Sequence, residues 1–467
     1  MAQFETSLRQ AWSPELPAVP AHLQPYRQDW LDTFQAGHLE ATSGEFHAAV
    51  REAPLVLVSD FHASERSRRG LATILAALPQ DQPLHLVLEL LPLGTTVTAQ
   101  LAIAGGAPTL VTGERLEDAY AEVLSLLAAR KGTLVGAWAD GSIGHRDRVI
   151  ADLLRRMQHP GRPARVLFHG GDWHLAEAHL PRLLRKRDLE PLVVHQSPEP
   201  LWEHRGLQRG PAHLKLDTPG HWAWMETPPL HLWASLLQDL RRGDEEDVAE
   251  AVAHLVGAAA DCLAELLDVP APEQELSFFP SRHWAEFHGQ LPTPWSEAFS
   301  ATQPPRRDLF HPRRPWAWAP RPADLNFLTR AAAHLLLCNQ AWIHDVSLQA
   351  ELRRVSFRQA AARVANPFLR ELDPRAEAEA LFEDADRARA TTLALRALDP
   401  ARLDELAADP ALLVLATRVW GSRSGHRLLD GAGFKPADLR DWLLQDQGDY
   451  DWGGLTATIR AANTPSS

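Results

Sequence analysis

The segment that decides the fold is residues 164–196, ARVLFHGGDWHLAEAHLPRLLRKRDLEPLVVHQ. An apolar run at residues 166–168 stops at two glycines, a helical pattern follows, and a second apolar run occupies residues 192–194. This order of strand, polar loop, helix and strand predicts one βαβ unit. The loop places Asp172 and His174 just beyond the carboxyl end of the first strand, where open parallel sheets bind their ligands.

Three earlier apolar runs, at residues 55–58, 84–88 and 133–138, also lead directly into ionisable residues. Helical patterns separate the runs, so we expect a mostly parallel sheet with right-handed crossovers. All carboxyl ends of such strands lie along one edge, and we predict a single site there. The ionisable residues at the four strand ends are Asp60 with His62, Glu89, Asp140 with His145, Arg146 and Asp147, and Asp172 with His174.

The length of 467 residues exceeds one ordinary core and predicts several domains. We expect an α/β class, with a central, mostly parallel sheet flanked by helices, followed by an all-helical C-terminal domain. The predicted parts are a helical lead-in at 1–50 that packs on the sheet, the α/β domain at 51–242, a helix at 243–269, a proline-rich linker or wrap at 270–325, and a helical domain at 326–467.

Composition restricts the class of partner. A net charge of −13 argues against nucleic acid, and two cysteines cannot form a disulfide framework. No apolar run approaches the ~20 residues that span a bilayer. The N-terminal residues show neither a signal peptide nor a lipidation cysteine. We therefore expect a cytoplasmic protein that binds a small molecule and spans no membrane, and we leave a homodimer open.

The residue types at the strand ends point to a histidine and carboxylate site. His62 and His174 can act as bases near neutral pH or as ligands of a metal or haem. Asp60, Glu89 and Asp172 can orient imidazoles, bind a metal or activate water.

The environment of these side chains leads to further expectations. Arg146 can hold an anionic group or an oxyanion, or it can form a structural ion pair. We expect the arginines at 66, 68 and 69 to hold the pKa of His62 down. We expect Asp172 or the start of the following helix to hold His174.

The chain resembles the ChaN-like family, whose superfamily includes the Tiki and TraB proteins and the erythromycin esterases. Residues 59–62 (SDFH), 86–92 (LVLELLP), 145–154 (HRDRVIADLL) and 170–181 (GGDWHLAEAHLP) match its motifs, and VVHQSPEPLW at 193–202 is similar to its continuation. Ser59 stands where the family has glycine. The resemblance covers residues 50–240 and implies a hydrolase-type or a haem-binding role.

Three functions are compatible with the sequence. The first is a hydrolase that activates water, with or without a divalent metal, against a small-molecule ester or amide. The second is a protein that binds haem or another porphyrin, with the tryptophan-rich segment 219–237 either as the apolar wall or as simple packing. The third is a non-catalytic scaffold. The candidate residues are His62, His174, Glu89 and Arg146 for catalysis, Asp60, Asp147, Asp172 and Trp173 for ligand binding, and His62, His174 and Glu89 for a metal.

The helical C-terminal half offers no comparable constellation. We predict that it carries no separate catalytic site. Its segment GSRSGHR, residues 421–427, has the spacing of a helix that ends at Gly421 rather than of a phosphate loop.

Overall fold

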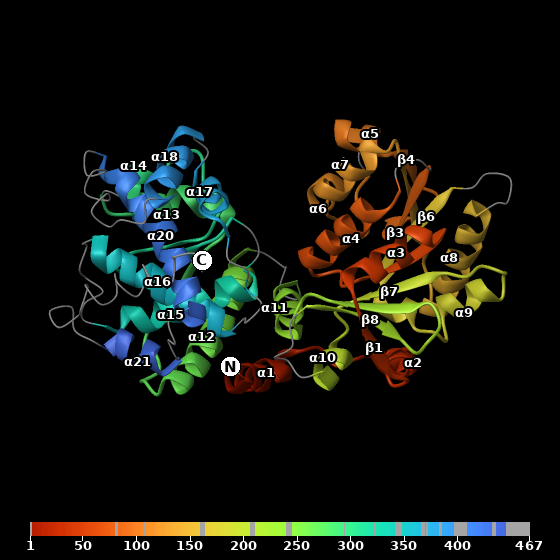
Figure 1. Cartoon of the computed structure of the whole chain (residues 1–467), viewed down its shortest axis with the longest axis horizontal. Coiled ribbons are helices and arrows are strands. Elements are labelled where there is room, and N and C mark those ends of the chain that lie inside the picture. Colours follow the sequence, from red (N-terminus) through yellow and green to blue (C-terminus); the bar gives the residue numbers. More distant parts are fainter. Residues whose placement is uncertain are drawn as a thin grey trace. The chain divides into compact units, whose positions relative to one another are not determined.

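The computed structural model divides into two compact units, which Figure 1 shows with their elements labelled. The α/β unit is Pro17–Leu232, and the helical unit combines Met1–Leu16 with Trp233–Ser467. The structure describes residues 2–79, 83–106, 108–158, 164–205, 211–239, 245–293, 295–320, 323–340, 348–365, 369, 372–382, 385–396, 409–431 and 436–444.

A nine-stranded sheet forms the centre of the α/β unit, in the order β1-β8-β9-β7-β2-β6-β3-β5-β4. The six strands from β9 to β5 are parallel, and β8, β1 and β4 are antiparallel to their neighbours. The predicted mostly parallel sheet is therefore confirmed. The strands are β1 (His38–Ala41), β2 (Leu55–Asp60), β3 (Leu84–Pro92), β4 (Thr96–Thr98), β5 (Thr133–Trp138), β6 (Arg165–Gly171), β7 (Leu192–Gln196), β8 (Ala212–Leu216) and β9 (His221–Met225).

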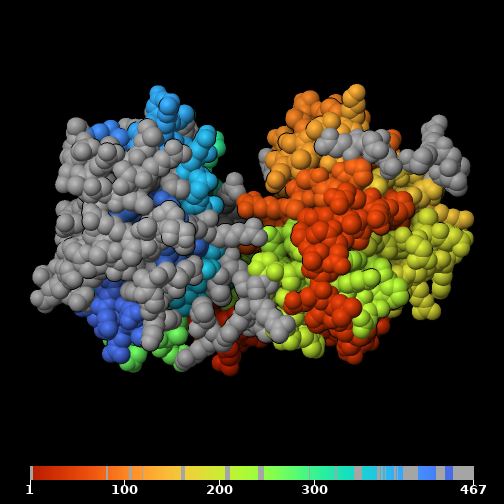
Figure 2. All heavy atoms as spheres, viewed as in Figure 1, coloured from red at the N-terminus to blue at the C-terminus, as the bar shows by residue number. Residues whose placement is uncertain are grey.

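Helices cover both faces of this sheet because successive side chains of a strand point to opposite sides. Along β2, Val56 and Val58 enter one hydrophobic cluster with α3 (Ser43–Glu52), α4 (Glu65–Ala77) and α7 (Ala121–Ala129), whereas Leu55 and Leu57 enter another with α8 (Ile143–Met157) and α9 (Leu180–Arg185). Strands buried on both faces read as continuous apolar runs, as the sequence indicated. In Figure 2, red and orange atoms from the N-terminal part of the α/β unit cover much of the face that this unit turns to the viewer.

The remaining helices of this unit lie at its edges and loops. They are η2 (Ala21–Leu23), α2 (Gln24–Thr33), α5 (Ala99–Leu101), η3 (Ala102–Gly106), α6 (Leu116–Ala119), η4 (Asp172–Leu175) and α10 (Glu199–Arg205), and α11 (Pro229–Asp239) crosses into the helical unit.

The strand order decides where the polar residues meet. β6 lies between β2 and β3, and the register pairs Asp60 with Gly171 and Leu88 with His169. Three of the strand ends that the sequence singled out are therefore immediate neighbours, although β6 follows both β2 and β3 along the chain.

The first fifty residues differ from the predicted lead-in. α1 (Ala2–Trp12) belongs to the helical unit, where it contacts α12 (Glu245–Leu267). Its apolar side chains at i, i+4 and i+8, Phe4, Leu8 and Trp12, are buried there rather than on the sheet. Residues 38–41 are a strand, β1, that pairs with β8.

The proline-rich segment is part of the helical unit, and it is the predicted wrap rather than a linker, because it packs against the rest of the unit. Trp284, Trp295 and Trp318 of this segment are buried. The segment contains η5 (Ser281–His283), α13 (Trp284–Gly289), α14 (Trp295–Ala298) and a three-stranded sheet of β10 (Ser277–Phe279), β12 (Trp316–Trp318) and β11 (Leu309–Phe310). Outside it lie η1 (Ser13–Glu15), α15 (Leu325–Cys338), α16 (Leu348–Ala365), α17 (Pro374–Leu381), α18 (Ala385–Arg396), α20 (Pro410–Gly431) and α21 (Pro436–Leu444).

The predicted helix end at Gly421 is wrong, because α20 continues through it. Gly421 and Gly425 face α16 instead. A Cβ at Gly425 would lie 2.0 Å from the Ser356 carbonyl oxygen, and one at Gly421 would lie 2.8 Å from Val355 Cβ. The two glycines therefore let the helix backbones approach closely.

Candidate functional site

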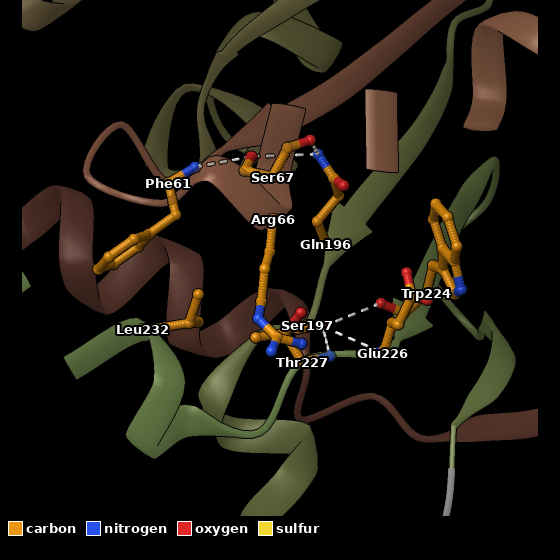
Figure 3. A pocket seen from close by; sticks show the side chains of 9 residues that line it. All are labelled: Phe61, Arg66, Ser67, Gln196, Ser197, Trp224, Glu226, Thr227 and Leu232. Atoms are coloured by element: carbon orange, nitrogen blue, oxygen red, sulfur yellow. Dashed lines mark hydrogen bonds between the residues drawn. The ribbon is translucent and has the colours of Figure 1, made fainter. Parts of the chain in front are cut away.

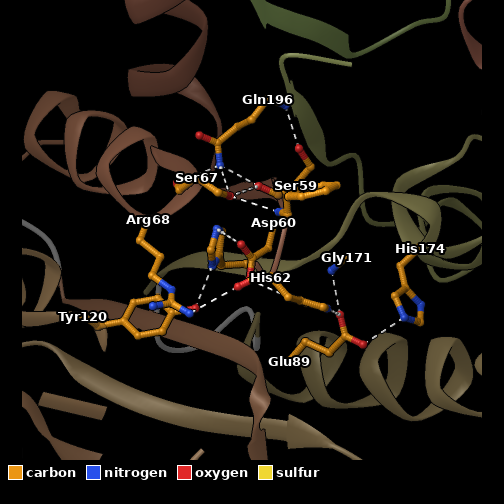
Figure 4. A network of polar contacts seen from close by, with 12 residues as sticks. Ser59, Asp60, His62, Ser67, Arg68, Glu89, Tyr120, Gly171, His174 and Gln196 are labelled. Atoms are coloured by element: carbon orange, nitrogen blue, oxygen red, sulfur yellow. Dashed lines mark hydrogen bonds and ion pairs between the residues drawn. The ribbon is translucent and has the colours of Figure 1, made fainter. Parts of the chain in front are cut away.

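Glu89 is the centre of a group of charged side chains at the carboxyl end of β3 (Figure 4). It accepts hydrogen bonds from Arg146 Nη1 at 3.1 Å, from His174 Nε2 at 3.0 Å and from the Gly171 amide at 2.6 Å. Burial opposes ionisation of this carboxyl group. The positive histidines and the Gly171 amide outweigh burial, and they lower the pKa of Glu89 to about 2. Glu89 is therefore an anion in the folded protein at any ordinary pH.

His174 lies on η4 and is held between two carboxylates. Its Nδ1 donates to Asp147 Oδ1 and its Nε2 to Glu89 Oε1. Although burial disfavours the cation, Glu89 and Asp147 raise the pKa of His174 to about 9. The prediction that Asp172 or the helix start holds this ring is wrong, because Asp147 reaches it from α8. An imidazolium that donates from both nitrogens has no lone pair for a proton or a metal.

His62 is placed differently. Its Nδ1 donates to Asp60 Oδ2 at 2.8 Å, while its Nε2 lies 3.9 Å from Glu89 Oε2, beyond hydrogen-bond distance. The side chain is 38% exposed, whereas the Asp60 side chain is 1% exposed. His62 therefore combines a fixed ring with one accessible nitrogen.

The pKa of His62 contradicts our expectation that nearby arginines hold it down. Burial does lower it, but Asp60 and Glu89 outweigh burial, and the pKa of His62 is raised above 6.5. One of those arginines, Arg68, turns its guanidinium to the His62 carbonyl oxygen at 3.3 Å and to Glu114 Oε2 at 3.0 Å. These two oxygens therefore compensate the charge of Arg68, which does not hold down the pKa of the His62 imidazole.

Sequence reasoning missed two members of this group, His169 and Tyr120. His169 is buried in β6, with Nε2 3.6 Å from Asp60 Oδ1 and Nδ1 3.3 Å from the Tyr120 hydroxyl. Burial lowers the pKa of His169, so the ring is neutral. The available signal was the strand pairing. His169 precedes the glycine pair by one residue and faces the same edge, but an imidazole inside an apolar run looks like core.

Asp172 joins a separate chain of polar contacts. Its Oδ1 accepts from His195 Nδ1 at 2.6 Å and its Oδ2 from Trp30 Nε1 at 2.7 Å. His195 Nε2 then lies 3.0 Å from His221 Nδ1, whose other nitrogen lies 3.0 Å from Glu177 Oε2. The side chain of Asp172 is thus turned towards β7 and β9 rather than towards His62.

The structure brings together four of the residues that we expected to converge, namely His62, Glu89, Arg146 and His174. A Cβ at Gly171 would lie 3.4 Å from His62 Nε2 and 3.6 Å from His174 Cδ2. The two rings therefore lie well within the ~10 Å, or two strand spacings, that we predicted.

The other predicted residues take supporting places. Arg146 stacks its guanidinium 4.6 Å from the Trp138 ring while it donates to Glu89. Of the two roles that we considered, it therefore has the structural ion pair rather than the free anion-binding group. Asp147 is buried behind His174, and Trp173 is half-buried on the same turn. Asp140 and His145 are exposed, and among the described residues their side chains form no hydrogen bond or ion pair with this group.

The geometry gives no support to the predicted metal set of His62, His174 and Glu89. Within the described residues, no three His, Cys, Asp or Glu side chains are arranged to hold a metal ion. Three N–H donors already occupy Glu89, and the adjacent His174 and Arg146 cations would repel a further positive ion. Haem fits no better, because it needs an axial ligand beside an apolar wall, and His62 Nε2 faces a carboxylate.

A small cavity lies beside this group, at the ends of β2, β7 and β9 (Figure 3). Its volume is about 10 Å³, which suffices for roughly one water. Arg66 and Trp224 line it, and Ser197 donates and accepts hydrogen bonds at its floor. Trp222 and Trp224 are buried against Phe46, which supports the packing interpretation of the tryptophan-rich segment.

Among the described helices, none has the length and hydropathy that crossing a membrane requires. Comparison with known proteins adds no relative, since no family model, curated protein or solved structure matches this chain.

Proposed function

We propose that this chain is a hydrolase in which His62 activates water against a small-molecule ester or amide. One observation supports the proposal above all. His62 is fixed through Nδ1 by a buried carboxylate and keeps Nε2 without a hydrogen bond in the described structure, in a side chain that is 38% exposed. Hydrolases that use a carboxylate to orient a histidine base have this arrangement.

The proposed reaction uses His62 first as a base and then as an acid. Neutral Nε2 takes a proton from a water molecule, and the resulting hydroxide adds to the carbonyl carbon of the substrate. Asp60 stabilises the imidazolium that forms, because its carboxylate accepts the Nδ1 hydrogen bond. The imidazolium then donates its proton to the leaving alcohol or amine as the carbon–oxygen or carbon–nitrogen bond breaks.

Glu89 and its partners have a positioning role in this proposal. Glu89 Oε2 lies 3.9 Å from His62 Nε2, so a water bonded to that nitrogen is within reach of the carboxylate. His174 and Arg146 keep Glu89 ionised and fixed. A carboxylate held this way stabilises the His62 cation without taking its proton. The resemblance to the ChaN-like family, which rests on the four motifs, is consistent with this role and is also a proposal.

The test is hydrolysis of chromogenic esters such as p-nitrophenyl acetate by the full chain and by His62→Gln. Glutamine can still donate to Asp60, so the fold is expected to persist, while the rate falls by about 10²–10⁴-fold, the usual contribution of a general base. A matched control is His145→Gln at an exposed position of α8, which should keep the full rate. A His62→Gln protein with the wild-type rate, or a purified protein with a Soret band, would contradict the proposal.

A further inference from the structure

The helical unit contains a group of arginines around a cavity that has no part in the proposed hydrolysis. The cavity has a volume of about 40 Å³, whereas one ordered water needs about 10–15 Å³. α15, α16, α17, α20 and the segment at β11 all contribute to its wall. The charged residues that line it are Arg307, Arg330, Arg358 and Arg418, with Asp308 and Glu377.

The two acidic residues of this wall are already paired with two of its four arginines. Asp308 accepts both hydrogen bonds of a fork from Arg330, at 2.9 and 3.2 Å. Glu377 pairs with Arg307 and also accepts a hydrogen bond from the Ser422 hydroxyl at 3.1 Å. Among the described residues neither carboxylate forms a hydrogen bond with the other two arginines, although Asp308 attracts both of them electrostatically.

Arg358 and Arg418 form their ion pairs with one carboxylate, Glu351, which also pairs with a third arginine. Glu351 is 1% exposed and accepts from Arg354 Nε at 3.0 Å. Arg358 Nη2 and Arg418 Nη1 each lie 3.8 Å from Glu351 Oε1, too far for a hydrogen bond. Arg358 is 2% exposed, and its Nη1 donates no hydrogen bond to any described residue.

The balance of charge around the cavity is therefore positive. Among the described residues, the lining of the cavity contributes four guanidiniums and two carboxylates, and the adjoining pair of Arg354 and Glu351 adds one of each. Burial, opposed by Glu351 but reinforced by Arg418 and Arg354, lowers the pKa of Arg358 to about 9. A buried cation without a full partner is costly to the fold, and a bound anion would remove that cost.

We propose that this cavity binds a tetrahedral oxyanion, the phosphate group of a small ligand, between Arg358 and Arg418. The guanidinium fork suits phosphate oxygens, to which it can donate two parallel hydrogen bonds. The proposal does not depend on the hydrolase function, because the residues belong to the helical unit.

The experiment is calorimetric titration of the full chain with inorganic phosphate at fixed ionic strength. We expect saturable one-site binding, and a melting temperature that rises with phosphate more than with chloride of equal ionic strength. Arg418→Gln should weaken binding about tenfold, because it removes one charge-assisted contact. Arg418→Lys, which keeps the charge but not the fork, should give an intermediate affinity.

The matched control is Arg375→Gln on α17, whose guanidinium is exposed and pairs with Glu379. It removes the same charge from the same unit and should leave the phosphate affinity unchanged. Equal weakening by Arg375→Gln and Arg418→Gln would mean that phosphate responds only to net charge, and would overturn the proposal. The absence of saturable binding to the wild-type chain would overturn it as well, whatever the variants do.

Discussion

At the residue scale, hydrogen-bond partners give two histidines of similar sequence context opposite roles. His174 donates from both nitrogens to buried carboxylates, while His62 donates from one and keeps the other accessible. The first arrangement fixes a positive charge within the fold. The second leaves a nitrogen that can exchange a proton with a ligand.

Replacing His174 should therefore reduce stability. His174→Gln leaves the buried carboxylates of Glu89 and Asp147 without their shared cation, a change that typically costs about 3–5 kcal/mol. Urea unfolding measures this loss, and His145→Gln, an exposed change on α8, is the matched control. Equal stability of the two variants would show that the His174 cation does not hold the site together.

The pKa values of His174 and Glu89 predict how stability depends on pH. The pKa of His174 is raised from 6.5 to about 9, so its contribution is complete below pH 6.5 and is lost as pH rises through about 9. The pKa of Glu89 is lowered from 4.5 to about 2, so its contribution is present above pH 4.5 and is lost as pH falls towards 2. We expect the difference in unfolding free energy between wild type and His174→Gln to be largest between pH 4.5 and 6.5, where both contributions are complete. A difference that is constant from pH 5 to 10 would be inconsistent with a buried cation.

The pKa of His62 leads to a prediction about activity. A general base works only when neutral, so kcat/KM should rise with pH through a pKa above the ordinary histidine value of 6.5. Asp60→Asn removes the carboxylate that raises this pKa, so the rising limb should move to lower pH while the plateau falls. A limb that stays in place in Asp60→Asn would assign the titration to another group.

At the element scale, the glycines of α20 allow its backbone to approach that of α16 closely. Gly425→Ala would place a methyl group 2.0 Å from the Ser356 carbonyl oxygen of α16, so the helices must separate. We expect a loss of about 1–3 kcal/mol in thermal or urea unfolding, as in other overpacked interiors. Gly257→Ala in α12, where nothing lies within 4 Å, should instead stabilise by about 0.5–1 kcal/mol. Equal effects would mean that α16 and α20 are not in close contact.

At the scale of the whole molecule, the proposed active site lies within one compact unit. Every side chain of the Glu89 group falls inside Pro17–Leu232. A fragment of residues 17–232 should therefore unfold cooperatively and keep the ester hydrolysis of the full chain. Its comparison is a fragment of residues 1–232, which should be less soluble because Phe4, Leu8 and Trp12 of α1 lose the partner that buries them. An inactive but folded 17–232 fragment would show that the helical unit completes the site.

Much of this architecture could be predicted from the sequence. Apolar runs that stop at Asp, Glu and His indicated the parallel strands, and parallel strands imply a common edge. The direction of each side chain at that edge could not be predicted, because it depends on strand order. Asp172 turns to His195 because β7 follows β2 in the sheet, and His174 meets Asp147 because α8 covers the neighbouring strands. The sequence also led us to place α1 on the sheet, whereas it packs in the helical unit. An apolar stripe predicts that a helix face is buried but does not predict which element covers it.

The most direct test of the central claim is rescue of His62→Ala by imidazole. Truncation leaves space beside Asp60 for a free imidazole, which can accept the proton that the side chain no longer takes. We predict that ester hydrolysis by His62→Ala is lost and returns in proportion to imidazole concentration, whereas His174→Ala gains nothing from imidazole. A His62→Ala protein that hydrolyses the ester at the wild-type rate without imidazole would contradict the assignment of His62 as the base.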